Sequence, residues 1–161
     1  MALRQVVTHS PEETIEFGRE LAHSLTPPVL VLLIGELGAG KTTLAKGLVA
    51  GVGAAAEADV TSPTFTLVHE YGRGAGGSPR VYHVDLYRIE DARDLETVGL
   101  EDLLEEPAVV IVEWGEKLGS SFRHPFPGGR LTEIRLEAVS DTERRLQIQT
   151  VEGAEEKTLR P

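Results

Sequence analysis

The sequence predicts an α/β protein built as a three-layer sandwich, in which a mixed sheet combines a parallel core with antiparallel hairpins. An unbroken apolar run at 29–34 ends at a glycine-rich turn and is followed by apolar residues at helical spacing, as in a buried strand that leads into a helix. Paired strand-like segments within 61–87 and 131–151 predict the hairpins. The length of 161 residues fits a single domain, 1–161, whose tail after about residue 153 we expect to be frayed.

The first expected elements are a short strand at 6–8 and a helix. Ser10 is suited to cap this helix, with Pro11 at its first position and Glu13 completing a capping box. Apolar residues share one helical face as far as Leu25, so we expect the helix to end there, before a Thr-Pro-Pro segment.

The central motif is the turn that follows the buried strand. Its eight residues, from Gly35 to Thr42, read GELGAGKT and match G-x-x-x-x-G-K-[ST], the Walker A phosphate-binding loop or P-loop. In such a loop, backbone N–H groups and a helix N-terminus converge on phosphate oxygens. Gly35, Gly38 and Gly40 are expected to allow positive φ angles and a close approach of the ligand. Lys41 would contact the β and γ phosphates, and Thr42 would give its hydroxyl to Mg²⁺.

The loop makes the predicted fold P-loop NTPase-like, with a helix that should end at Gly53. The alternative, a glycine-rich turn that binds nothing, has no need of Lys followed by Thr at its mouth. The expected nucleotide contacts in this segment are Glu36, Leu37, Gly38, Ala39, Gly40, Lys41, Thr42 and Thr43.

A β-hairpin is expected next, with strand-like runs at 61–71 and 80–87 around a glycine-rich tip at 72–78. Thr61, Ser62 and Thr64 form a hydroxyl cluster where many nucleotide hydrolases keep a segment that orders on the γ-phosphate. A polar turn that merely leads into a strand is an equally good interpretation of this cluster.

Two carboxylates stand at the ends of apolar strands. Asp85 follows 81–84, and Glu113 follows the more apolar run 108–112, which is the better match to a strand that delivers a carboxylate to Mg²⁺. Because ligands bind at the carboxyl ends of parallel strands, both positions suit a site, although either residue alone could be an ordinary loop residue. His83 lies on the same side of its strand as Asp85, and we interpret it as a structural histidine.

The remaining chain contains an acidic, helix-prone segment at 91–106, a Gly, Ser and Pro-rich loop at 119–129, and a closing hairpin of 131–138 with 144–151. Trp114 is the only tryptophan; it either packs over a nucleotide, faces a partner or is simply half-buried.

Composition limits the classes of function. The formal net charge is −10, which disfavours direct binding to a nucleic-acid backbone. The chain has no cysteine, so it has neither disulfides nor thiolate metal sites. We find no signal-peptide pattern, lipidation motif or long apolar run, and therefore expect a soluble, cytoplasmic protein without membrane attachment.

The chain closely resembles the bacterial TsaE (YjeE) family from Ser10 to about Leu136. The resemblance rests on four motifs in order: GELGAGKTT at 35–43, SPTF at 62–65, HVDLYR at 83–88 and EWGE at 113–116. Members of this family are small ATPases required for the threonylcarbamoyladenosine modification of tRNA. They work through the tRNA threonylcarbamoyl transferase and its scaffold paralogue, and meet tRNA only indirectly.

By this resemblance, ATP or ADP and Mg²⁺ are the cofactors. Thr42 and Glu113 would hold Mg²⁺, and Asp85 would organise the metal or activate water. Thr64 would belong to a mobile switch and, with Lys41 and Asp85, complete the catalytic set. Trp114 would lie near the nucleotide.

Two other classes of function stay open at this stage. A small-molecule kinase would need lid arginines, for which Arg73, Arg80 and Arg88 are the nearby candidates. A GTPase-like module would need an N/T-K-x-D guanine loop, which the sequence lacks.

Overall fold

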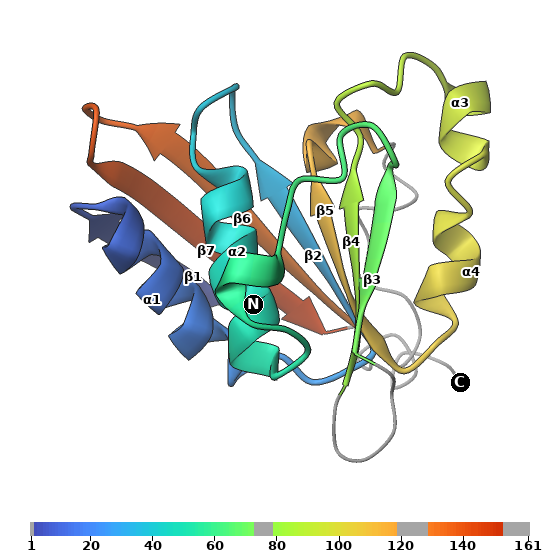
Figure 1. Ribbon diagram of the computed structural model, residues 1–161, viewed down its shortest axis with the longest axis horizontal. Coiled ribbons are helices and arrows are strands. Elements are labelled where there is room, and N and C mark those ends of the chain that lie inside the picture. The colour runs from blue at the N-terminus through green and yellow to red at the C-terminus, as the bar shows by residue number, and fades with distance from the viewer. Residues whose placement is uncertain (1, 73–78, 119–128, 153–161) are drawn as a thin grey trace, which may run out of the picture.

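The computed structural model describes residues 2–72, 79–118 and 129–152 and contains a seven-stranded mixed sheet with the order β1-β7-β6-β2-β5-β4-β3 (Figure 1). The strands are β1 Ala2–Thr8, β2 Val29–Ile34, β3 Val68–Tyr71, β4 Arg80–Asp85, β5 Ala108–Glu113, β6 Arg130–Ala138 and β7 Arg144–Glu152. Strands β6, β2, β5 and β4 run parallel, whereas β3 pairs antiparallel with β4, and β7 pairs antiparallel with both β6 and β1. The predicted mixed sheet, with a parallel core and antiparallel hairpins, is confirmed.

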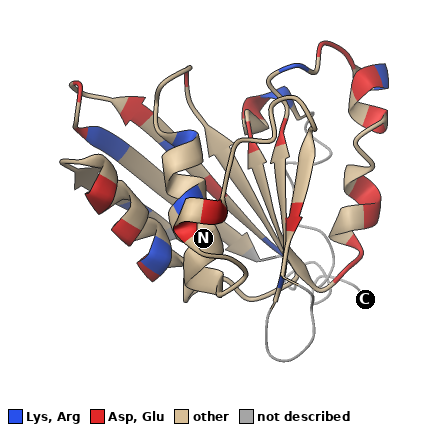
Figure 2. Cartoon of the chain, in the orientation of Figure 1, with Lys and Arg blue, Asp and Glu red and all other residues tan. Residues whose placement is uncertain are grey.

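Helices cover both faces of this sheet and complete the predicted three layers (Figure 1). One layer contains α1 Pro11–Ala22 and α2 Lys41–Val52, and the other contains α3 Ala92–Glu96 and α4 Leu100–Leu104. Short 3₁₀ helices follow α2 and β5, as η1 Glu57–Asp59 and η2 Gly115–Lys117. Figure 2 shows acidic residues, in red, along α3 and α4, as expected for the solvated face of the acidic segment.

The two central strands are buried along their whole length, because helices cover both of their faces. In β2, Val29, Val31 and Leu33 pack toward α1 and α2, whereas Leu30 and Leu32 belong to the core on the other face. The same alternation in β4 and β5 places every second residue toward α2. His83, Asp85 and Glu113 lie in register with this α2-facing set, because alternate residues of a strand share a face.

Helices α1 and α2 pack closely through glycines. A Cβ atom at Gly47 would collide with the carbonyl oxygen of Ile15, and one at Gly18 would lie 2.8 Å from the carbonyl oxygen of Leu44. Both distances are below ordinary van der Waals contact, so the backbones meet without intervening side chains. This packing fixes the position of α2, and therefore of the loop from which α2 starts.

The N-cap and first residue of α1 are as predicted, since the backbone N–H of Glu13 donates to the Ser10 hydroxyl and Pro11 is the first helical residue. The Glu13 carboxylate differs from the predicted capping box, because it accepts the N–H of His9 rather than that of Ser10. The end of α1 is not as predicted. The helix stops at Ala22 rather than Leu25, because the N–H groups of residues 23–25 donate to carbonyls three residues back and form a tighter turn. The acidic segment also differs, as Gly99 with φ 71° interrupts it and leaves two short helices.

The predicted strand from Thr61 begins only at Val68. Leu67 has φ 71°, a left-handed conformation that an extended strand does not contain, and its N–H donates to the carbonyl of Pro63. Residues 61–67 therefore are not part of the strand, and 64–66 form a turn before it. The antiparallel pairing of β3 with β4 is confirmed, while most of the glycine-rich tip lies outside the described residues.

The closing hairpin of β6 and β7 is confirmed with the predicted inward side chains, including Ile134 paired with Ile148 and Leu136 paired with Leu146. Residues 119–128 of the predicted loop and the tail from 153 lie outside the described residues. Within the described ranges, no helix is long and apolar enough to cross a membrane.

Candidate functional site

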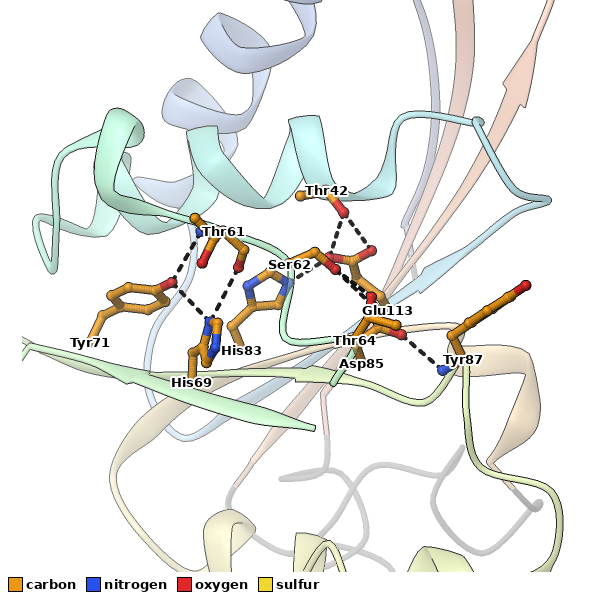
Figure 3. A network of polar contacts seen from close by, with 10 residues as sticks. All are labelled: Thr42, Thr61, Ser62, Thr64, His69, Tyr71, His83, Asp85, Tyr87 and Glu113. Atoms are coloured by element: carbon orange, nitrogen blue, oxygen red, sulfur yellow. Dashed lines mark hydrogen bonds and ion pairs between the residues drawn. The ribbon is translucent and has the colours of Figure 1, made fainter. Parts of the chain in front are cut away.

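The candidate site lies at the carboxyl ends of β2, β5 and β4, beside the N-terminus of α2 (Figure 3). The three strands are parallel neighbours, so their last residues meet at one edge of the sheet. This edge collects the glycine-rich loop after β2, Glu113 at the end of β5 and Asp85 at the end of β4.

The loop has the strained backbone that its glycines predict at two of three positions. Gly38 has φ 83° and Gly40 has φ 101°, both in the left-handed region that favours glycine. Gly35 was expected to share this conformation, but it does not have a positive φ. It is needed for space instead, because a Cβ atom there would lie 2.7 Å from the carbonyl oxygen of Leu136 in β6.

Lys41 is almost completely buried, with 5% of its surface exposed, and its side chain lies along the loop. Its Nζ donates to the carbonyl oxygens of Gly35 at 2.5 Å and Glu36 at 2.8 Å. Burial lowers the pKa of Lys41, an effect that nearby carboxylates, Glu116 first among them, oppose. The ammonium group is therefore held at the loop rather than in the apolar core.

Trp114 lies directly against this lysine. Its ring centroid is 3.9 Å from the Lys41 Nζ, and its other contacts are with Tyr87, at 5.2 Å between ring centroids, and with Lys117. The backbone of Trp114 has φ 62°, the left-handed conformation, which turns the chain sharply after β5. The tryptophan is thus half-buried and lies beside the loop, and its packing over a nucleotide stays a prediction.

Thr42 and Glu113 are in direct contact. The Thr42 hydroxyl donates to the Glu113 carboxylate, with distances of 2.9 Å to Oε1 and 3.0 Å to Oε2 (Figure 3). The other side of that carboxylate faces His83, whose Nε2 lies 2.6 Å from Oε2. Both His83 and Glu113 are buried, with 0% and 3% of their side chains exposed.

Asp85 belongs to a separate set of contacts. Its Oδ2 accepts hydrogen bonds from the hydroxyls of Ser62 at 3.0 Å and Thr64 at 2.8 Å, and its Oδ1 accepts one from the backbone N–H of Tyr87 (Figure 3). The hydroxyl cluster is therefore tied to this carboxylate, which a plain polar turn does not require. Thr61 is not part of this group; its N–H faces the Tyr71 hydroxyl at 3.4 Å.

The donor set at Thr42 and Glu113 fits Mg²⁺. Magnesium prefers oxygen ligands and, next to a phosphate loop, is usually held by one hydroxyl, one carboxylate, phosphate oxygens and water. Among the described residues no group of three or more His, Cys, Asp or Glu side chains is suited to a metal, which argues against an all-protein metal cage there. Asp85, also named as a metal ligand, contacts hydroxyls and a backbone N–H, and its role at the metal stays a prediction.

The other expected nucleotide contacts follow the loop. Glu36, Leu37 and Gly38 are exposed, with 77% of Leu37 accessible, whereas Ala39 is buried and Thr43 is half-buried. The two candidate lid arginines among the described residues, Arg80 and Arg88, make unrelated contacts. Arg80 pairs with Glu70 and Glu106 at the opposite end of β4, Arg88 lies over the Phe65 ring, and Arg73 is outside the described residues.

Sequence reasoning missed two contacts at this edge. His83 was interpreted as a structural residue, although its position two residues before Asp85, on the same face, was a usable signal. Arg144 was treated only as the start of a strand, but its guanidinium donates to the carbonyl oxygen of Gly38 at 3.1 Å. No local pattern could indicate this second contact, which joins residues 106 positions apart.

Comparisons with known proteins show which family this chain is similar to. Residues 8–146 match the family described as "Threonylcarbamoyl adenosine biosynthesis protein TsaE". Relatives named "tRNA threonylcarbamoyladenosine biosynthesis protein TsaE" include that of Haemophilus influenzae, 36% identical over 122 residues, which are 71% of this chain and 74% of the relative. Those of Mycobacterium tuberculosis and Treponema pallidum are 37% and 33% identical, over 84% and 88% of this chain and 79% and 97% of theirs.

A solved structure also matches. The crystal structure of Bacillus subtilis YdiB is similar with a TM-score of 0.67 and 28% sequence identity, covering 98% of this chain and 91% of that one. The likeness extends over nearly the full length of both chains, and therefore includes the edge of the sheet at which the candidate site lies.

Proposed function

The chain belongs to the TsaE family, and from that premise we propose that it is a Mg²⁺-dependent ATP hydrolase that serves the threonylcarbamoyladenosine modification of tRNA. The family and its named relatives support the role in this biosynthesis. One observation carries the finer proposal of ATP hydrolysis. The Thr42 hydroxyl of a Walker A loop is in contact with a carboxylate, Glu113, that ends the adjacent buried strand.

The loop would bind the phosphates of ATP. Its N–H groups and the N-terminus of α2 attract negative charge, and Lys41 adds a full positive charge at the loop mouth. A phosphate oxygen would replace the loop carbonyls that Lys41 now contacts, since a charge-assisted bond to phosphate is stronger than one to a neutral carbonyl. The Trp114 ring lies over the ammonium group of this lysine, at 3.9 Å from its centroid, and would stabilise the positive charge there.

Thr42 and Glu113 would hold Mg²⁺, which when bound neutralises charge between the β and γ phosphates. His83 fixes the orientation of Glu113 by occupying one of its oxygens. Asp85 is the candidate for orienting the attacking water. Ser62 and Thr64, the hydrogen-bond partners of Asp85 in this structure, would belong to a segment that changes conformation when the γ-phosphate binds.

The protein would act as an accessory ATPase of a larger assembly. In related NTPases an arginine supplied in trans can raise turnover by ~10³–10⁵. We therefore expect slow hydrolysis by the protein alone and faster hydrolysis with the tRNA threonylcarbamoyl transferase and its scaffold paralogue. With a net charge of −10, the protein would meet tRNA through these partners rather than directly.

Steady-state phosphate release tests the proposal. It would be measured for the protein alone, with tRNA, and with the transferase plus its scaffold paralogue, and the products would be analysed for ADP and for any phosphorylated acceptor. We expect slow release of phosphate and ADP, no effect of tRNA alone and a marked increase with the two proteins. Rapid turnover by the protein alone, indifferent to those proteins, would contradict the accessory role, and a phosphorylated small molecule would indicate a kinase.

A further inference from the structure

The Arg144 side chain forms hydrogen bonds with two backbone segments, the phosphate loop and the turn between β6 and β7. Its Nη2 donates to the carbonyl oxygen of Gly38 in the phosphate loop, at 3.1 Å. Its Nη1 donates to the carbonyl oxygens of Ser140 at 2.8 Å and Glu143 at 3.0 Å, in the turn between β6 and β7. The side chain also passes close to Gly40, where a Cβ atom would lie 3.5 Å from Nε.

The backbone of Arg144 is held firmly by strand pairing. Arg144 pairs with Ala138 on one side and Thr8 on the other, so its backbone lies inside a three-stranded segment of the sheet. The turn before it is closed by the Ser140 hydroxyl, which accepts the N–H groups of residues 142 and 143. A guanidinium projecting from such a base loses little conformational freedom when it contacts the loop.

The positive charge of Arg144 faces the loop without a carboxylate partner among the described residues. The adjacent carboxylate, that of Glu143, is turned to His9, with 2.8 Å between Oε2 and Nδ1. Among the described residues, the hydrogen-bond acceptors of Arg144 are all backbone carbonyls. Arg145, the next residue, differs in this respect, because it forms an ion pair with Glu137.

The contact with Gly38 is made to the part of the loop that has a left-handed backbone. Gly38 and Gly40 both have positive φ, and residues 36 to 38 are exposed, so the hydrophobic core contacts this segment only through Ala39. A donor that holds the Gly38 carbonyl on the outer side of the loop favours the orientation in which N–H groups face the phosphate. The guanidinium also adds positive potential behind the anion site.

We propose that Arg144 is a positioning residue of the phosphate loop, which holds Gly38 and Gly40 in the shape that binds the β-phosphate of a nucleotide. The inference rests on the proposed nucleotide binding and extends it to a strand at the far side of β6. Because the β-phosphate is common to ADP and ATP, loss of Arg144 weakens both nucleotides alike. We expect it to affect binding more than the chemical step, since the contact is made to the loop and not to the reacting atoms.

The test compares Arg144→Met and Arg144→Lys with the matched neighbour variant Arg145→Met. Dissociation constants for MgADP and MgATP would be measured by calorimetry and by the emission of Trp114, the only tryptophan, which lies against Lys41. We expect Arg144→Met to bind both nucleotides about tenfold more weakly, as for the loss of one charge-assisted hydrogen bond. Arg144→Lys should be intermediate, Arg145→Met should match the wild type, and kcat at saturating ATP should stay within about twofold in all three.

Three outcomes would overturn the inference: wild-type MgADP affinity in Arg144→Met, an equal loss in Arg145→Met, or a fall in kcat with unchanged affinity. Circular dichroism and thermal unfolding identify a variant that does not fold, and in that case Arg144→Lys, which keeps the charge and the aliphatic stem, decides the result. Failure of the proposed function itself has a different signature, because the wild type would then bind neither nucleotide.

Discussion

The Nε2 atom of His83 lies 2.6 Å from Oε2 of Glu113, and both side chains are almost completely buried between the sheet and α2. A carboxylate only accepts hydrogen bonds, so Nε2 carries the hydrogen that is donated. Glu113 therefore has two fixed donors, the His83 ring and the Thr42 hydroxyl. This arrangement resembles the outer contacts that orient metal ligands in proteins, and it gives His83, which we interpreted as a structural histidine, a defined partner in the site.

His83→Leu should weaken the apparent affinity for Mg²⁺ by about tenfold or more, because Glu113 loses a contact that fixes its orientation. The measurement is a Mg²⁺ titration of ATP binding, followed by Trp114 emission. His83→Gln, which retains a donor, should recover part of the affinity. If both variants need no more Mg²⁺ than the wild type, His83 has only a packing role.

Lys41→Ala should lose ATP hydrolysis while the fold survives. The Lys41 ammonium contacts loop carbonyls and the Trp114 ring rather than the apolar core, so its removal leaves the core intact. Loss of its contact with phosphate should cost about 1.5–3 kcal/mol of binding, and more in the transition state. Phosphate release at saturating ATP is measured beside Lys46→Ala, a variant on the same helix; near-normal turnover of Lys41→Ala would refute the assignment of the loop.

Glu113→Ala should raise the Mg²⁺ concentration required for hydrolysis, whereas Asp85→Ala should lower turnover without a comparable shift. The reason is that Glu113 shares its oxygens with Thr42, while Asp85 is bound to Ser62 and Thr64. Hydrolysis rates would be recorded across a Mg²⁺ titration for both variants. A shift seen with Asp85→Ala and absent with Glu113→Ala would mean that the two roles are exchanged.

Gly47→Ala should destabilise the protein by about 1–3 kcal/mol, because the added methyl group has no space between α1 and α2. It would collide with the carbonyl oxygen of Ile15 and lie 3.1 Å from the Cα of Gly18. Chemical denaturation gives the free energy of unfolding, with Lys46→Ala as the control on the partly exposed side of α2. An unchanged midpoint in Gly47→Ala would show that the helices can separate at little cost.

The sequence by itself determined the elements whose signals are local. The apolar run of β2, the glycines and lysine of the loop and the Ser10 cap each lie within a few residues of what they specify, so pattern and spacing were enough to predict them. Asp85 and Glu113 could be placed at one edge for a related reason. Any carboxylate that ends a parallel core strand must lie there, whatever the order of the strands.

Only the tertiary structure decided which of these residues touch. That Glu113 meets Thr42 and His83, while Asp85 meets Ser62 and Thr64, depends on strand order, on register and on the turn at Leu67, whose positive φ no residue pattern indicated. Only glycine fits at position 35, because β6 passes beside it. Arg144 reaches Gly38 because β7 lies next to β6 in the sheet. Such contacts join segments far apart in the chain, and their energy depends on the packing of the whole sheet, which local sequence preferences do not encode.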